Sequence, residues 1–114
     1  MPVGITTHVL DVARGRPAAG VPVALEVFSG GEWKELACAE TDGDGRAKQL
    51  LPPDHVLTLG TYRLTFDLAS WFSTQEIEAF YPSATIVFLV RNAGQHYHVP
   101  LLLSPYGYST YRGT

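Results

Sequence analysis

Apolar and polar residues alternate along most of this chain with a period of two, which is typical of β-strands. Strands are therefore predicted over residues 5–12, 21–28, 33–41, 62–68, 84–90 and 95–103. The alternation is lost over residues 69–77, where a short helix with Ser70 as its N-cap is expected. About eight short strands and one short helix predict an all-β protein, a β-sandwich folded as a single domain over residues 1–114.

The C-terminal segment, residues 98–114, is unusually rich in large side chains. It contains an apolar stretch, three tyrosines and Arg112, and it closes with Tyr-Arg-Gly-Thr. C-terminal residues are normally small, polar and poorly ordered. We expect this segment to pack into a groove or a subunit interface and to contribute to a small polar pocket.

Composition and charge exclude several classes of protein. Hydrophobic residues make up 46% of the chain and charged residues 17%, which excludes intrinsic disorder. A net charge of −3 disfavours a nucleic-acid-binding protein. The longest apolar run, 86–90, is far shorter than the roughly 20 residues that cross a bilayer. The first residues lack the features of a secretion signal, so a cytoplasmic protein is expected.

Cys38 is the single cysteine of the chain. It cannot form an internal disulfide, which favours a reducing compartment. Since it lies in the middle of a predicted strand without a basic neighbour, we expect a buried, inert thiol.

Histidines and arginines are the candidate functional residues. The chain contains four histidines, at positions 8, 55, 96 and 98. An imidazole can take or give a proton near neutral pH, although a histidine on a strand is more often structural. Arg46 follows a Gly-rich turn and Arg112 lies near the end of the chain. Either arginine could hold a carbonyl-rich or anionic ligand with planar hydrogen bonds, or simply be solvated or paired with a carboxylate.

Other motifs are incomplete. His96 and His98 point to the same face of a strand, a spacing that suits a metal, but no Cys, Asp or Glu lies near them in sequence. Residues 42–45 resemble the start of a calcium loop, but Pro53 stands where the closing glutamate belongs. The two Asp-Gly steps in residues 42–45 predict a hairpin. The sequence lacks a Gly-x-Ser-x-Gly elbow and a phosphate-binding loop.

Three segments together resemble one enzyme family, the 5-hydroxyisourate hydrolases of urate breakdown, which are related to transthyretin. These segments are residues 7–11 (THVLD), 41–46 (TDGDGR) and 98–114. Transthyretin, a hormone carrier, is similar in several segments but lacks the histidines and the arginine that match His8, His98 and Arg46. The resemblance therefore favours an enzyme over a carrier.

The resemblance implies a fold, an assembly and a reaction. The implied fold is a transthyretin-like sandwich of two four-stranded sheets with one short helix. The implied assembly is a homotetramer, a dimer of dimers, with its active sites between dimers. The implied reaction opens the six-membered ring of 5-hydroxyisourate by hydrolysis to 2-oxo-4-hydroxy-4-carboxy-5-ureidoimidazoline, with no metal and no cofactor.

The resemblance also implies roles for individual residues. His8, Arg46 and His98 are expected to be catalytic, with one histidine as general base and Arg46 stabilising the oxyanion. His8 and Arg46 would also bind the substrate, together with Tyr111, Arg112 and Thr114, a set that closes the pocket. Thr114 replaces the usual terminal serine but keeps a hydroxyl group. His55 and His96 match no motif position and are expected to be structural.

Two other functions remain open at this stage. One is a transthyretin-like protein that carries a small ligand without chemistry. The other is a metal-binding sandwich that uses His96 and His98. Insensitivity of the activity to chelators would separate the hydrolase from the metal protein.

Overall fold

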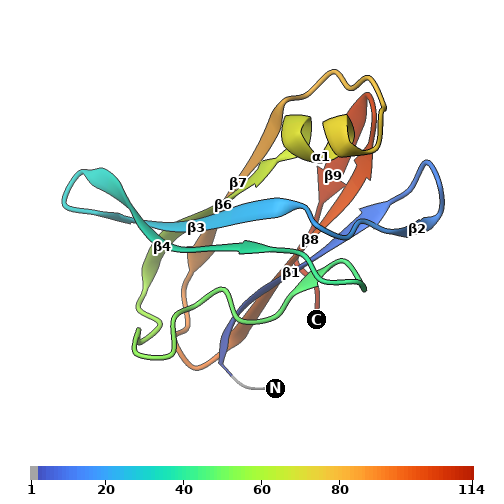
Figure 1. The fold of residues 1–114 in the computed structure, drawn as a ribbon. Helices are drawn as coiled ribbons and strands as arrows, with labels where there is room; N and C mark the ends of the chain where they lie inside the picture. The colour runs from blue at the N-terminus through green and yellow to red at the C-terminus, as the bar shows by residue number, and fades with distance from the viewer. Residues whose placement is uncertain (1–2) are drawn as a thin grey trace.

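The protein, described over residues 3–114 by a computed structural model, consists of two β-sheets that face each other (Figure 1). The first sheet contains β1 (Gly4–Asp11), β2 (Arg16–Pro17), β5 (Arg46–Ala47), β8 (His96–Ser104) and β9 (Gly107–Thr110). The second contains β3 (Pro22–Ser29), β4 (Glu32–Glu40), β6 (Gly60–Asp67) and β7 (Ser83–Val90). Residues 1 and 2, the start of the predicted domain and of the segment searched for a secretion signal, lie outside the described residues.

The all-β sandwich predicted from the sequence is confirmed, with one difference in strand number. The first sheet has five strands because the two residues of β2 pair with Leu10 and Asp11 at the end of β1. None of the helical turns formed by residues 3–114 has the length and apolar character needed to cross a membrane.

The core lies between the sheets and is filled by alternate residues of their strands. In β1 the side chains of Ile5, Thr7 and Val9 are buried, while those of the residues between them are half-buried. The largest fully buried side chains are Tyr62, Phe66, Ile5, Leu25, Leu50, Leu64, Leu68, Leu101 and Leu103. Each side chain of this size contributes roughly 1.5–3 kcal/mol when it leaves water. The alternation seen in the sequence is thus the inside–outside pattern of the sandwich.

Strands β1 and β8 form the centre of the first sheet and run parallel. Their register places Thr6 beside His98. Because Tyr97 and Val99 point into the core, His96 and His98 point to the opposite face of β8. The same argument places Thr6 on the outer face of β1, so this pairing brings polar groups from both ends of the chain together.

The helix α1 (Leu68–Thr74) begins and ends earlier than predicted. Its N-cap is Asp67, whose carboxylate accepts a hydrogen bond from the backbone N–H of Ser70 at 3.0 Å. The expectation that Ser70 caps the helix was therefore wrong. Burial of Leu68, Trp71 and Phe72 against the sandwich decides where the helix starts.

The Asp-Gly turn does not form the predicted hairpin. The strands on either side of it, β4 and β5, belong to different sheets, and β5 pairs with β1. The turn is nevertheless tight, because the N–H of Gly45 donates to the carbonyl of Asp42 at 2.9 Å. It therefore carries the chain from one sheet to the other.

The prediction of a buried thiol was also wrong, because Cys38 is exposed. It lies on β4, a strand at the edge of the second sheet, and donates a hydrogen bond to Glu35 at 3.2 Å. This hydrogen bond to a carboxylate raises the pKa of the Cys38 thiol, which disfavours the reactive thiolate.

Candidate functional site

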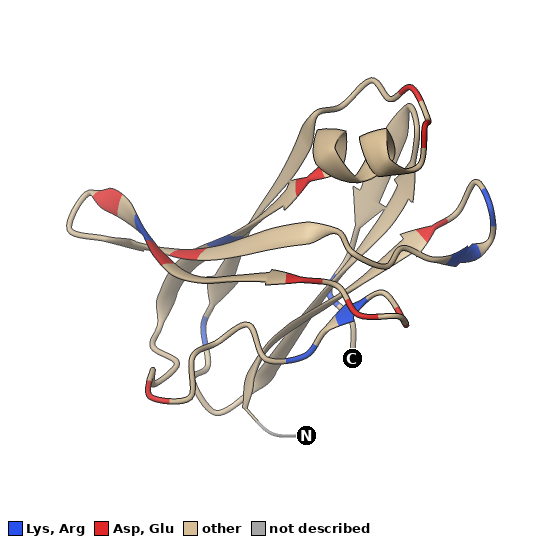
Figure 2. Ribbon diagram, in the orientation of Figure 1, with Lys and Arg blue, Asp and Glu red and all other residues tan. Residues whose placement is uncertain are grey.

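A pocket of about 460 Å³ lies where β1, β5 and β8 meet the C-terminal residue. Its lining residues are Thr6, Thr7, Arg46, Lys48, His96, His98 and Thr114. Figure 2 shows basic residues on β5 and just after it, close to the C-terminus. The pocket therefore combines imidazole, guanidinium and hydroxyl groups from four separate parts of the chain.

The pairing of β5 with β1 places Arg46 opposite His8. The ring of His8 donates from Nε2–H to the backbone carbonyl of Asp44 at 2.8 Å. Since a carbonyl can only accept, Nε2 must carry the hydrogen. The neutral ring of His8 then keeps its lone pair on Nδ1.

The turn before β5 holds Arg46 against β1. The carboxylate of Asp42 accepts hydrogen bonds from the backbone N–H groups of Asp44 at 2.9 Å and Arg46 at 3.0 Å. The bond from Arg46 is the main cause that lowers the pKa of Asp42. Gly45 has a φ of 78°, and a side chain there would collide with the carbonyl of Val9. The glycine allows the turn to lie directly on β1.

The surroundings of His98 act on both its position and its pKa. Its Nδ1 lies 2.8 Å from the hydroxyl of Thr6. Burial lowers the pKa of His98, and the positive charge of Arg46 lowers it further, with smaller contributions from His8 and His96. A hydrogen bond to the backbone of Thr6 acts in the opposite direction and raises the pKa of His98. The net effect favours a neutral imidazole, which is the form that can accept a proton.

The end of the chain folds back over His98. The backbone N–H of Gly113 donates to the carbonyl of His98 at 2.8 Å, and the two residues form a β-bridge. A Cβ at position 113 would lie 2.5 Å from Cδ2 of His98, so only glycine fits without a shift. This contact brings Thr114 to the pocket.

Tyr111 and Arg112 do not line this pocket. They line a separate, largely apolar pocket of about 250 Å³ together with residues of β7 and β8. The guanidinium of Arg112 lies 4.6 Å from the ring centroid of Tyr97 and donates to the side-chain oxygen of Gln95 at 3.1 Å. In the single chain, these two side chains therefore lie apart from the groups that could do chemistry.

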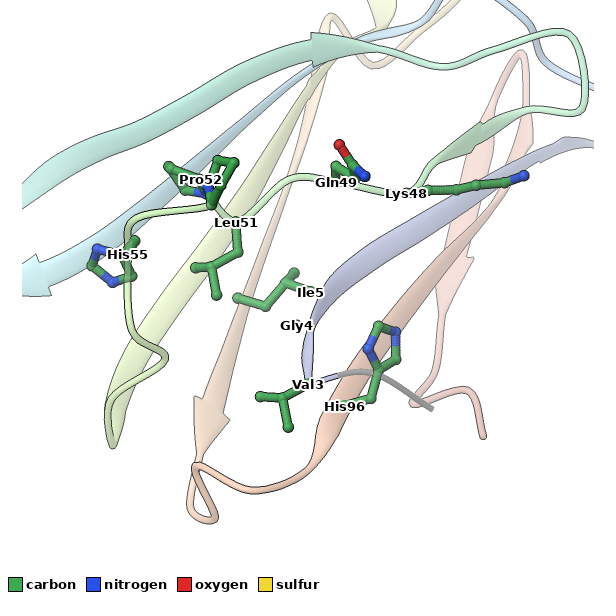
Figure 3. Close-up of a pocket in the computed structure, with 10 residues that line it drawn as sticks. Val3, Gly4, Ile5, Lys48, Gln49, Leu51, Pro52, His55 and His96 are labelled. Atoms are coloured by element: carbon green, nitrogen blue, oxygen red, sulfur yellow. The ribbon is translucent and has the colours of Figure 1, made fainter.

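Another pocket, of about 340 Å³, adjoins the pocket around His98 and shares Lys48 and His96 with it. Figure 3 shows its lining residues, with His96 on β8 and His55 in the loop on the opposite side. Within residues 3–114, Nε2 of His55 is buried without a hydrogen-bond partner. His55 does not line the pocket around His98.

Thr6, Thr7 and Lys48 line the pocket although no role was predicted for them, and His96 was expected only as a structural residue or, in the alternative, as a metal ligand. The hydroxyl of Thr6 lies 2.8 Å from Nε2 of His96 as well as 2.8 Å from Nδ1 of His98. Strand alternation placed His96 on the same face as His98 in the sequence analysis, and this signal correctly indicates that the two imidazoles share a site. The signal for Thr6 is weaker, because it depends on the register between β1 and β8.

The described part of the chain contains no group of three or more histidine, cysteine or acidic side chains arranged to hold a metal ion. The charged and polar groups of the pocket are instead two cationic side chains, two imidazoles and hydroxyl groups.

Fold and pocket together define a transthyretin-like sandwich with an imidazole–guanidinium site on its β1–β8 sheet. The profile of the HIUase/Transthyretin family matches residues 5–113, and the chain belongs to this family. A 5-hydroxyisourate hydrolase of Caulobacter vibrioides is 46% identical over 115 residues, covering 97% of this chain and 98% of that protein.

Solved structures give the same fold. The 5-hydroxyisourate hydrolase of Klebsiella pneumoniae superposes with a TM-score of 0.83 and 35% identity, covering 96% of this chain and 98% of that one. Sea bream transthyretin in complex with thyroxine superposes with a TM-score of 0.89 and 29% identity, covering 96% and 94%. Since both proteins share the fold, the residues of the site have to separate the two functions.

Proposed function

We propose that this protein is a 5-hydroxyisourate hydrolase, folded as one domain over residues 1–114. The observation that carries the proposal is the presence of His98 and Arg46 in one pocket, with His8 paired to Arg46 beside it. High identity to hydrolases over nearly the full length supports it further. The protein would act in urate degradation.

The reaction requires a base, a stabiliser of negative charge and a proton donor. His98, whose lowered pKa favours the neutral imidazole, would remove a proton from a water molecule. The resulting hydroxide would attack a carbonyl carbon of the six-membered ring, and the guanidinium of Arg46 would stabilise the oxyanion that forms. Cleavage of the C–N bond would then open the ring, and the departing nitrogen would take the proton that His98 removed from water, or one from Nδ1 of a protonated His8.

The remaining site residues would hold the substrate. Thr114 lies at the pocket, so its hydroxyl can hydrogen-bond to a ligand there. Tyr111 and Arg112 lie in the separate pocket, and their predicted contact with substrate would need an approach from another subunit or a movement of the tail. No cofactor and no metal are part of the proposed mechanism.

A homotetramer is the proposed assembly. Exposed large apolar side chains on the edge strands β7 and β9 support it: Val87 and Leu89 on β7 and Tyr108 on β9. Tyr111, just after β9, is 57% exposed in the single chain. Such groups are usually covered by a partner surface. Light scattering of the purified protein tests the assembly, and a cytoplasmic location remains the prediction from the sequence.

The alternative function is a carrier of a small ligand, and the similarity to sea bream transthyretin favours it as the second candidate. The two functions predict different results in one assay. Urate oxidase generates 5-hydroxyisourate in solution, and the decay of its absorbance is followed with and without the purified protein. A hydrolase accelerates the decay, and the acceleration persists with a chelator present. A folded tetramer that leaves the spontaneous rate unchanged would be a carrier.

A further inference from the structure

The hydroxyl of Thr6 occupies a position between two imidazoles. It lies 2.8 Å from Nδ1 of His98 and 2.8 Å from Nε2 of His96. A hydroxyl has one hydrogen to donate, and its oxygen can accept. It can therefore donate to one of the rings while it accepts from the other, and this constraint couples the hydrogen positions on both rings.

We propose that Thr6 is a positioning residue for His98: its hydroxyl fixes the ring by Nδ1 and determines which ring nitrogen faces the pocket as an acceptor. This proposal rests on the proposed function, because His98 acts as a base only in the hydrolase reaction. Thr6 itself does not need to touch the substrate.

The surroundings of His98 select one of the two possible arrangements. Arg46 on β5 and Lys48 just after it line the same pocket, and both carry positive charge. A lone pair directed toward these cations is more favourable than an N–H group. The arrangement that satisfies this has Nδ1–H of His98 donating to Thr6 and the hydroxyl of Thr6 donating to Nε2 of His96. Nε2 of His98 is then the acceptor.

The side-chain hydrogen bond between Thr6 and His98 is made at Nδ1, so Nε2 can serve a water molecule or a substrate in the pocket. The titratable and charged groups that face His98 are His8 on β1, Arg46 and Lys48 at β5, His96 on β8 and the C-terminal residue, Thr114. The tautomer of a histidine is set by the hydrogen bond at its other nitrogen. Thr6 is the residue that makes this bond.

Thr6→Val removes the hydroxyl and keeps the shape of the side chain. Valine is favourable in strands, and position 6 is on the half-buried outer face of β1, so the variant should fold. We expect kcat/KM to fall about tenfold or more, the effect of one lost hydrogen bond at a reacting group. In the arrangement above the hydroxyl accepts from Nδ1–H of His98, and such a bond is stronger when the ring is protonated, so its loss should shift the acid limb of the pH profile to lower pH. Thr6→Ser keeps a hydroxyl and should restore both quantities.

Thr65→Val is the matched control, since Thr65 points outward from β6 in the other sheet. It should leave rate and pH profile unchanged. Wild-type kcat/KM and an unmoved acid limb in Thr6→Val would overturn the proposal.

A measurement without substrate separates this proposal from the proposed function. Nitrogen-15 NMR of the imidazoles reports the tautomer of His98 directly. We expect the Nδ1–H form in the wild type and a shift toward the Nε2–H form in Thr6→Val. A wild-type protein without hydrolase activity would refute the proposed function, while identical His98 tautomers in both proteins would refute the role of Thr6.

Discussion

Replacing Gly113 with alanine tests whether the C-terminal segment positions His98. The added Cβ would lie 2.5 Å from Cδ2 of His98 and 3.2 Å from its Cγ. Non-bonded carbon atoms pack at about 3.5–4.0 Å, so the ring or the tail has to move by about 1 Å. The ring is also tied to Thr6 at 2.8 Å, and the tail to His98 through the N–H of Gly113. Either movement disturbs a hydrogen bond of the site.

A displacement of about 1 Å at a catalytic group can reduce the rate about 100-fold. We therefore expect kcat/KM of Gly113→Ala to fall about 100-fold, which corresponds to about 2.7 kcal/mol of transition-state stabilisation. The fold should survive, because Gly113 is half-buried at the end of the chain and its φ lies outside the left-handed region.

The assay is the decay of 5-hydroxyisourate produced by urate oxidase, with thermal unfolding and light scattering of each variant measured alongside. Gly107→Ala is the control in the same tail. Its Cβ would lie 3.7 Å from the hydroxyl of Ser104, an ordinary contact, and its rate should match the wild type. A folded Gly113→Ala variant of native size with wild-type kcat/KM would refute the proposed positioning by the tail.

Three further predictions concern the base, its pKa and the helix cap. His98→Ala should lose at least about 100-fold in rate while it keeps its assembly and thermal stability, and wild-type rates would remove His98 from the mechanism. Since burial and Arg46 lower the pKa of His98 below its ordinary value of 6.5, activity should persist below pH 6.5 and be lost only as the pH falls through the lowered pKa. Arg46→Gln should raise this pKa in an NMR titration, and an unchanged value would contradict the electrostatic argument. Asp67→Ala should lower the free energy of unfolding in urea by about 1 kcal/mol. Ser70→Ala should have a smaller effect, because the cap uses only the backbone N–H of Ser70.

Local patterns in the sequence were enough to predict the six longer strands and the sandwich, whereas the short strands β2, β5 and β9 lay outside the predicted ranges. Alternation reports which side of a strand is buried, and this is a property of neighbouring residues. The helix boundary was less predictable because Asp67 and Ser70 are both good caps. Burial of Leu68 decided between them, and burial is set by the rest of the fold.

The site was predicted only in part, because its geometry depends on which strands pair. The Asp-Gly turn gave a strong hairpin signal, yet β5 pairs with β1 rather than with β4. That pairing is what sets Arg46 beside His8. The position of Thr6 between His96 and His98 depends on the parallel register of β1 and β8, which no local pattern contains. For the same reason, the location of Arg112 in a separate pocket could not be read from the tail motif.

The parallel pairing of β1 with β8 has a consequence for how the protein becomes active. Thr6 and His98 are 92 positions apart in the chain, yet their side chains are in direct contact. Contacts between such distant residues form slowly, because a long loop must close before any of them stabilises the structure. During synthesis β1 emerges first and has to wait, with one edge unpaired, until the last strands have been made. We expect enzymatic activity to appear only with the final docking of β8, so that the rate of hydrolysis during refolding reports completion of the fold rather than its beginning.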